Sequence, residues 1–153
     1  MKVNPRILTI KKLYQSRTVS SDIVVPQIIL SGVWLQKAGF NSSESVLVSV
    51  KRNKLIIEKD RGQIIQGDIR RIKISYAYVQ REKGYKKVPK IVLSGLWLQA
   101  ANFNCREKIR VDVTTKGITI EKLSLKSSEA VLLHLYQAPH NIFTMYEYPA
   151  FIC

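Results

Sequence analysis

The stretch PQIILSGVWLQ, residues 26–36, recurs in the same chain as PKIVLSGLWLQ, residues 89–99. The offset of 63 residues holds without a gap between residues 26–59 and 89–122, and 17 of the 34 aligned positions are identical. Both tryptophans of the chain fall at equivalent places. The period is too long for most solenoid repeats and two copies are too few for an array, so the pattern indicates either a duplicated small domain or a homodimer fused into one chain.

The duplication extends upstream of this stretch. Arg6–Ile10 corresponds to Arg70–Ile74 with an offset of 64, because the first copy carries one extra residue before its proline. Two glycines and several polar residues interrupt the pattern between the copies. We therefore predict a first copy over residues 1–60, a linker over 61–69, a second copy over 70–123, and an aromatic C-terminal tail over 124–153 whose role is open.

The first half of each copy is predicted to hold two strands. In the second copy, apolar residues alternate with polar ones over 72–76, the period of a half-buried strand. The polar stretch 80–87 predicts a loop, and 91–93 predicts a second strand that starts near Pro89.

A short helix and two more strands complete each copy. Ser94 is the expected N-cap of the helix. Gly39 and Asn102, which tolerate a left-handed conformation, are expected to end the two helices. Phe40 and Phe103 follow, placed to fold back on the helices. Strands predicted at 109–113 and 118–120 give a β-β-α-β-β unit.

The predicted fold class is mainly β with short helices. A unit of about 60 residues with one short helix buries too little core to stand alone. We therefore expect the two tandem units to share one core, as a pseudo-dimer within a monomeric chain. Trp34 and Trp97 are expected to anchor that core rather than stack on bases.

The outlying property of the composition is charge. The chain has 25 Lys and Arg against 11 Asp and Glu, a formal net charge of +14. Residues 1–63 carry +7, residues 64–123 carry +8, and the remainder carries −1. The commonest partner of a basic domain is nucleic acid, while ribosomes, anionic membrane surfaces and acidic proteins remain alternatives.

The basic residues gather at the first strand of each copy and in the stretch that follows. The expected nucleic-acid-binding residues are Arg6, Lys11, Lys12, Arg17, Arg70, Arg71, Lys73, Arg81, Lys83, Lys86, Lys87 and Lys90. Tyr14, Tyr76, Tyr78 and Tyr85 interleave with them, and tyrosine can stack on a base or bond a phosphate. The alternative is that lysine-rich strands are ordinary solvated edges that discourage aggregation.

Other classes of function have little support. The cysteines and histidines lack metal-ligand spacing, so we expect no metal, no cofactor and no small-molecule substrate. No window approaches a membrane span, and the expected location is cytoplasmic.

The duplicated pattern resembles the SymE toxin family. The resemblance rests on RIKISY at residues 71–76, the motif LSGxWLxxAGF at residues 30–40, its variant at 93–103, and the alternating strands after it. It implies a SpoVT/AbrB-like swapped-hairpin barrel whose paired N-terminal hairpins form a basic nucleic-acid-binding face. It also implies a toxin of a type I toxin–antitoxin system, held down by an antisense RNA and proposed to cleave RNA.

The sequence departs from the family pattern at three points. It has two copies where a typical member has one. Ser43-Glu44 and Arg106-Glu107 replace the usual Gly-Asp, and Asn102 replaces a glycine. The departures are expected to tune turns and leave the fold intact.

Catalytic residues are hard to find in this sequence. RNA cleavage needs an acid, a base and charge stabilisation, or carboxylates that hold a metal. His134 and His140 lie in the tail, and the repeated acids Glu44, Glu107, Glu58 and Glu121 have no neighbouring acid. The candidate pair is Tyr76 with Arg81, with Tyr14 and Arg17 as first-copy counterparts.

The sequence therefore predicts a SymE-like toxin that binds RNA or DNA, with endoribonuclease activity implied by resemblance alone. The first alternative is an AbrB-type DNA-binding regulator, antitoxin or nucleoid-condensing protein without catalysis. The second is a protein-interaction module whose tail docks a partner.

Overall fold

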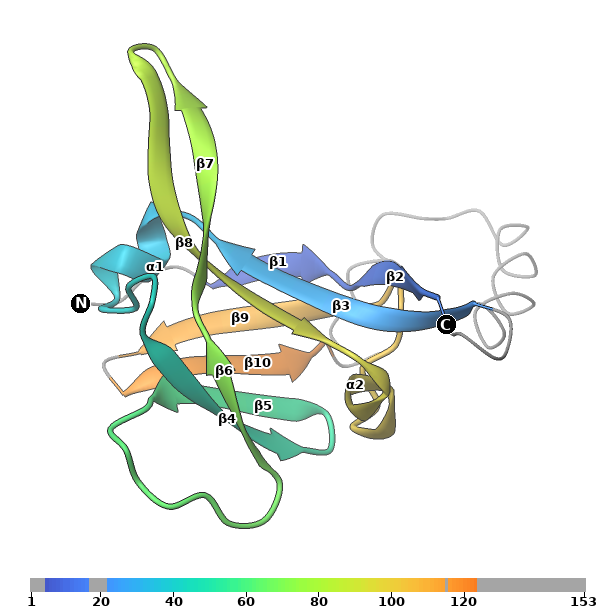
Figure 1. Ribbon diagram of the computed structural model, residues 1–153. Helices are drawn as coiled ribbons and strands as arrows, with labels where there is room; N and C mark the ends of the chain where they lie inside the picture. The colour runs from blue at the N-terminus through green and yellow to red at the C-terminus, as the bar shows by residue number, and fades with distance from the viewer. Residues whose placement is uncertain (1–4, 17–21, 115, 124–153) are drawn as a thin grey trace, which may run out of the picture.

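The computed structural model describes residues 5–16, 22–114 and 116–123. The prediction of a mainly β fold with two short helices is confirmed (Figure 1). The first copy contains β1 (Arg6–Thr9), β2 (Lys11–Gln15), β3 (Ile23–Ser31), α1 (Val33–Lys37), β4 (Ser45–Lys51) and β5 (Lys54–Lys59). The second contains β6 (Ile69–Lys73), β7 (Ser75–Arg81), β8 (Gly84–Ser94), α2 (Leu96–Ala100), β9 (Lys108–Thr114) and β10 (Gly117–Lys122).

The two copies exchange strands. A six-stranded sheet has the order β1-β9-β10-β5-β4-β6, and a four-stranded sheet has the order β2-β3-β8-β7. The first strand of each copy thus pairs with the fourth strand of the other, β1 with β9 and β6 with β4. At the centres of the sheets, β10 pairs with β5 and β3 pairs with β8. Neither copy could complete its sheets without the other.

Each copy first passes from the six-stranded sheet to the four-stranded sheet at a single isoleucine, and it returns through its helix. Ile10 separates β1 from β2, Ile74 separates β6 from β7, and both side chains are 1% exposed. The Ile74 N–H donates to the Glu44 carbonyl oxygen at 2.7 Å, and the Ile10 N–H donates to the equivalent Glu107 oxygen at 2.9 Å. The predicted strand over 72–76 is therefore two strands, because its backbone changes partner at Ile74.

One hydrophobic core lies between the sheets and takes side chains from both copies. Its members include Leu30, Leu35, Ile57, Ile91, Leu98, Phe103 and Ile120. Helix α1 packs against β8, and α2 packs against β3, so each helix also touches a strand of the other copy. The joint core expected from the small size of each unit is present.

The helix ends follow the sequence prediction, but the starts do not. Gly39 has φ 94° and Asn102 has φ 73°, and the Phe103 N–H returns to the Leu98 carbonyl oxygen at 2.8 Å. Ser94 is not the N-cap: it closes β8, and Gly95 holds the cap position without a side-chain cap bond. The Trp97 ring takes the space over Gly95, where an added Cβ would lie 2.9 Å from its Cδ1 atom.

The largest departure from the predicted elements is the β7–β8 hairpin. The stretch 80–87 is not a loop: β7 continues to Arg81, β8 begins at Gly84, and only Glu82 and Lys83 form the turn. The hairpin projects from the body of the molecule (Figure 1). Residues 81–87 are all exposed. The backbone pairing of β7 with β8 therefore defines the strands here, and no alternation of buried and exposed side chains marks them in the sequence.

Candidate nucleic-acid interface

The outer part of the β7–β8 hairpin is a basic projection. It carries Arg81, Lys83, Lys86 and Lys87, all exposed, and its one acid is Glu82. Within the described part of the chain, the side chains of Arg81, Lys83 and Lys86 make no ion pair or hydrogen bond. These three charges are therefore available to an anionic partner.

The same hairpin presents three tyrosines on one face. Tyr76, Tyr78 and Tyr85 are 50%, 63% and 73% exposed. The register pairs Tyr78 with Lys87 and Gln80 with Tyr85, and residues paired across a ladder share a face. The Tyr76 and Tyr78 rings meet edge to face with centroids 5.5 Å apart, and the Lys87 ammonium lies 4.2 Å from the Tyr76 centroid.

The candidate catalytic pair is not brought together. Tyr76 pairs with Pro89 near the base of the hairpin, while Arg81 pairs with Gly84 at its tip. They are five positions apart on one strand, so their side chains leave opposite faces and are separated by roughly 16 Å along it. No common reacting atom could touch both.

The register also corrects a first-copy assignment. Tyr14 pairs with Val24, and Tyr78 pairs with the equivalent Lys87. Tyr14 is therefore the counterpart of Tyr78, and Lys12 is the counterpart of Tyr76. Arg17, the predicted counterpart of Arg81, lies outside the described residues, as do His134, His140 and the tail.

Two of the predicted contact residues cover the tryptophans. The Arg70 guanidinium lies 4.5 Å from the Trp97 ring centroid, and Arg6 lies 4.6 Å from that of Trp34. Each indole packs against the core, and the Trp97 N–H donates to the Ser94 carbonyl oxygen at 2.8 Å. The arginine occupies the outer face of each ring, the face that a base would need for stacking.

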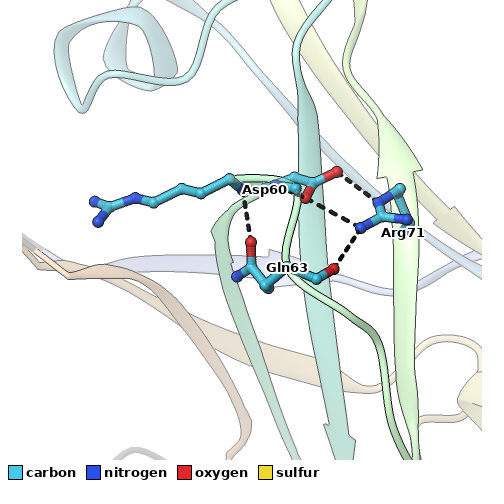
Figure 2. A network of polar contacts seen from close by, with 5 residues as sticks. Asp60, Gln63 and Arg71 are labelled. Atoms are coloured by element: carbon cyan, nitrogen blue, oxygen red, sulfur yellow. Dashed lines mark hydrogen bonds and ion pairs between the residues drawn. The ribbon is translucent and has the colours of Figure 1, made fainter.

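Arg71 is held by the segment between the copies (Figure 2). Its guanidinium donates to both carboxylate oxygens of Asp60, at 2.5 and 3.3 Å, and to the Gln63 carbonyl oxygen at 2.9 Å. The hydrogen bond from Arg71 holds the pKa of Asp60 below its ordinary value, helped by the Gly62 N–H and opposed by burial. This network fixes the chain between β5 and β6, so Arg71 is less available to a ligand.

The remaining predicted basic residues differ in accessibility. Lys11 and Lys73 are exposed, and Lys90 is half-buried in β8. Lys12 is also half-buried, and desolvation, followed by the charge of Arg106, lowers its pKa. An anion bound near Lys12 would offset both effects.

The repeated glutamates serve turns and surface ion pairs. Glu44 accepts the Asn41 N–H at 3.2 Å, and Glu107 accepts the equivalent Asn104 N–H at 2.7 Å. Glu121 lies 3.8 Å from Lys54, and Glu58 is exposed. Among the described residues, no group of three His, Cys, Asp or Glu side chains could hold a metal ion, and no helix is long and apolar enough to cross a membrane.

Sequence reasoning missed one basic pocket. It has a volume of about 730 Å³ and lies between the β4–β5 turn, the start of β6 and α2. Lys51 and Arg52 line it together with Arg70 and Trp97. The adjacent pair Lys51-Arg52 marks the β4–β5 turn as basic in the sequence. The proximity of this turn to α2 of the second copy appears only in the folded chain, where the copies exchange strands.

Comparison with known proteins identifies part of the chain. Residues 69–122 match the family described as toxin SymE of type I toxin–antitoxin systems. The match covers the second copy and less than half of the chain, and it confirms the family resemblance over that copy. The comparisons with curated proteins and with solved structures gave no match.

Proposed function

Because residues 69–122 match the family of SymE toxins of type I toxin–antitoxin systems, we propose that this chain is a toxin that acts by binding nucleic acid through its β7–β8 hairpin. The observation that carries the proposal is the projecting hairpin with exposed Arg81, Lys83 and Lys86, which have no ionic partner among the described residues. Such side chains neutralise phosphates and release condensed counterions, so binding is strong at low salt and weakens steeply as salt rises.

The first test is a salt titration of binding to labelled RNA and duplex DNA. The variant carries Arg81→Gln, Lys83→Gln and Lys86→Gln together. If each cation neutralises one phosphate, the slope of log affinity against log salt becomes shallower by about 2–3 for the variant. An unchanged slope, or no binding by the parent chain near 0.1 M salt, contradicts the proposal.

A matched control removes the same charge elsewhere. Lys37, Arg61 and Lys116 are exposed cations outside β7 and β8, and Arg61 and Lys116 line one pocket. Replacing all three by Gln lowers the net charge by the same amount. This control should retain most of the parent slope. An equal loss from both triple variants would mean that net charge alone, rather than the hairpin, drives binding.

Growth provides the cellular test of the toxin assignment. Overproduction of the parent chain is expected to arrest growth, and the hairpin triple variant at equal abundance is expected to relieve the arrest. Arrest of equal strength by the two chains would separate toxicity from hairpin binding.

The geometry supports binding more directly than RNA cleavage, because Tyr76 and Arg81 lie on opposite faces of β7. A second candidate is an AbrB-type regulator or DNA-condensing protein, which the exchange of strands between the copies favours. Gel assays that detect cleavage of labelled RNA, with and without Mg²⁺, distinguish an RNA-cleaving toxin from a protein that only binds. If the parent chain cleaves RNA and the Tyr76→Phe variant does not, Tyr76 has a catalytic role.

A further inference from the structure

We infer that the tyrosine face of the β7–β8 hairpin binds single-stranded nucleic acid by stacking on its bases. This inference rests on the proposed function and adds the form of the ligand. The face is made by Tyr76, Tyr78 and Tyr85, with Lys87 beside them. All three rings are at least half exposed, although large aromatic side chains normally bury most of their surface.

The spacing of the rings suits an unstacked strand. The Tyr76 and Tyr78 ring centroids are 5.5 Å apart, and Tyr78 and Tyr85 occupy diagonal positions about 7–8 Å apart. Bases in a stacked duplex rise only about 3.4 Å per step. A strand that offers one base to each ring must therefore be extended, with its bases separated.

A duplex does not offer the surface that this face would use. Its base faces are covered by neighbouring base pairs, and only base edges and phosphates are open to a protein. Single strands expose the π-faces on which aromatic side chains stack, with little dependence on sequence. The exposed tyrosines thus favour a single strand, while Arg81, Lys83 and Lys86 would contact phosphates of either form.

The three rings are not equivalent. Lys87 already lies over the Tyr76 ring, so one face of that ring is covered. Tyr78 and Tyr85 are the most exposed of the three. We assign base stacking mainly to these two residues, with Lys87 near enough to contact a phosphate of the same strand.

The first copy supplies a natural comparison. Tyr14 occupies the place of Tyr78 and is 67% exposed. Its neighbours differ, because Lys12 stands in place of Tyr76 and Asp22 in place of Tyr85. The first copy therefore has one isolated ring at this position, and the second has a group of three.

The test measures fluorescence anisotropy of labelled oligothymidylate DNA and oligouridylate RNA, each alone and annealed to its complement. The double variant Tyr78→Leu, Tyr85→Leu keeps apolar side chains and removes both rings. Each ring lost should weaken single-strand binding about tenfold. Duplex binding should change less than about threefold, because it depends on the unchanged cations.

Two controls define the effect. The variant Tyr78→Phe, Tyr85→Phe keeps the rings and should bind single strands within about threefold of the parent. Tyr14→Leu removes an equally exposed ring outside the group and should also remain within about threefold. Circular dichroism should show the same fold for all variants, because the altered side chains are exposed.

Equal affinity of the leucine variant and the parent for single strands would overturn the inference. An equal loss on duplexes would overturn it as well. Failure of the proposed function is a different result, in which the Arg81, Lys83 and Lys86 triple variant binds every probe like the parent. If the leucine substitutions weaken binding of single-stranded RNA and single-stranded DNA equally, stacking on the bases accounts for the contact. If the loss of affinity is larger for one of them, the tyrosine face still binds the strand and the larger loss identifies the preferred nucleic acid.

Discussion

Ser43 and Arg106 hold equivalent turn positions with a left-handed backbone. Their φ values are 75° and 71°, and each precedes the glutamate that closes the turn before β4 or β9. The left-handed region costs most L-residues about 1–2 kcal/mol and costs glycine almost nothing. Glycine, which the resemblance to the SymE pattern implies at this position, would hold this conformation without that cost.

Ser43→Gly is therefore expected to raise the free energy of unfolding by about 0.5–1 kcal/mol, after the added flexibility of glycine in the unfolded chain is subtracted. Urea denaturation of the purified chain measures the change. Ser45→Gly, two residues later in β4, is the matched control and should lower stability by about 0.5–1 kcal/mol. A loss at both positions would contradict the strain argument.

Asp60 makes stability depend on acid pH. Its side chain is 11% exposed, and its bonds from Arg71 and Gly62 hold its pKa below the ordinary value. The unfolded chain therefore binds this proton more readily than the folded chain does. The stabilisation is complete above the ordinary aspartate pKa of about 3.9 and disappears as pH falls through the lower folded value.

Asp60→Asn should consequently destabilise the chain at pH 7, and the difference from the parent should shrink as pH is lowered below about 4. Denaturant midpoints measured between pH 7 and pH 3 give the comparison. Asp22→Asn removes an exposed carboxylate and should have a smaller effect at every pH. A parent–variant difference that stays constant with pH would rule out the carboxylate as its source.

At the scale of the element, the hairpin marks where sequence patterns lose information. The alternation in 109–113 and 118–120 predicted β9 and β10 because one face of each is buried. In residues 81–87 both faces are exposed, so polar side chains on a strand have the same pattern as a loop. The basic residues could be predicted from composition, but the common face of Tyr76, Tyr78 and Tyr85 depends on register, which the sequence does not state.

The start of α2 and the partners of three arginines escaped prediction for related reasons. Ser94 has the right chemistry for an N-cap, yet the packing of Trp97 over Gly95 sets the start of α2 one residue later. Arg6, Arg70 and Arg71, which are predicted to bind nucleic acid, are exposed, and each also has a partner brought close by tertiary structure. A local sequence pattern shows which types of side chain are present. It does not show which distant residues those side chains will contact in the folded chain.

The β6–β7 crossing should be a sensitive point of the fold. Ile74 is 1% exposed and belongs to the core, at the residue where the chain changes sheets. Ile74→Ala keeps the backbone hydrogen bonds and removes the packing, so it should cost about 2–5 kcal/mol of unfolding free energy. Ile10→Ala should cost a similar amount because it occupies the equivalent place.

The control for this pair is Ile64→Ala. Ile64 is 87% exposed, so its truncation should change stability by less than about 0.5 kcal/mol. Urea denaturation of the three variants gives the comparison. A small loss at Ile74 and Ile10 would mean that the crossings can move independently of the core.

At the scale of the whole molecule, both copies build the fold, whereas the candidate binding surface lies on the second copy. Both copies supply strands to both sheets, but the exposed tyrosine group and the exposed hairpin cations Arg81, Lys83 and Lys86 belong to the second copy. Duplication has therefore kept the shared core nearly symmetric, with Ile10 matching Ile74 and Trp34 matching Trp97, while the projecting surfaces have diverged. An asymmetric surface on a symmetric core is an option that a symmetric homodimer of single copies lacks.

The exchange of strands makes a direct prediction about the second copy alone. In the intact chain, β6 pairs with β4, and the outer edge of β9 is covered by β1. A fragment of residues 64–123 lacks both partners from the first copy. Its β6 can find an equivalent partner only in β9 of another fragment, so we expect a twofold dimer whose melting temperature rises with concentration. Light scattering and thermal melts over a hundredfold concentration range test this, with the full chain as a concentration-independent control; a folded monomeric fragment would show that one copy can close its own sheets.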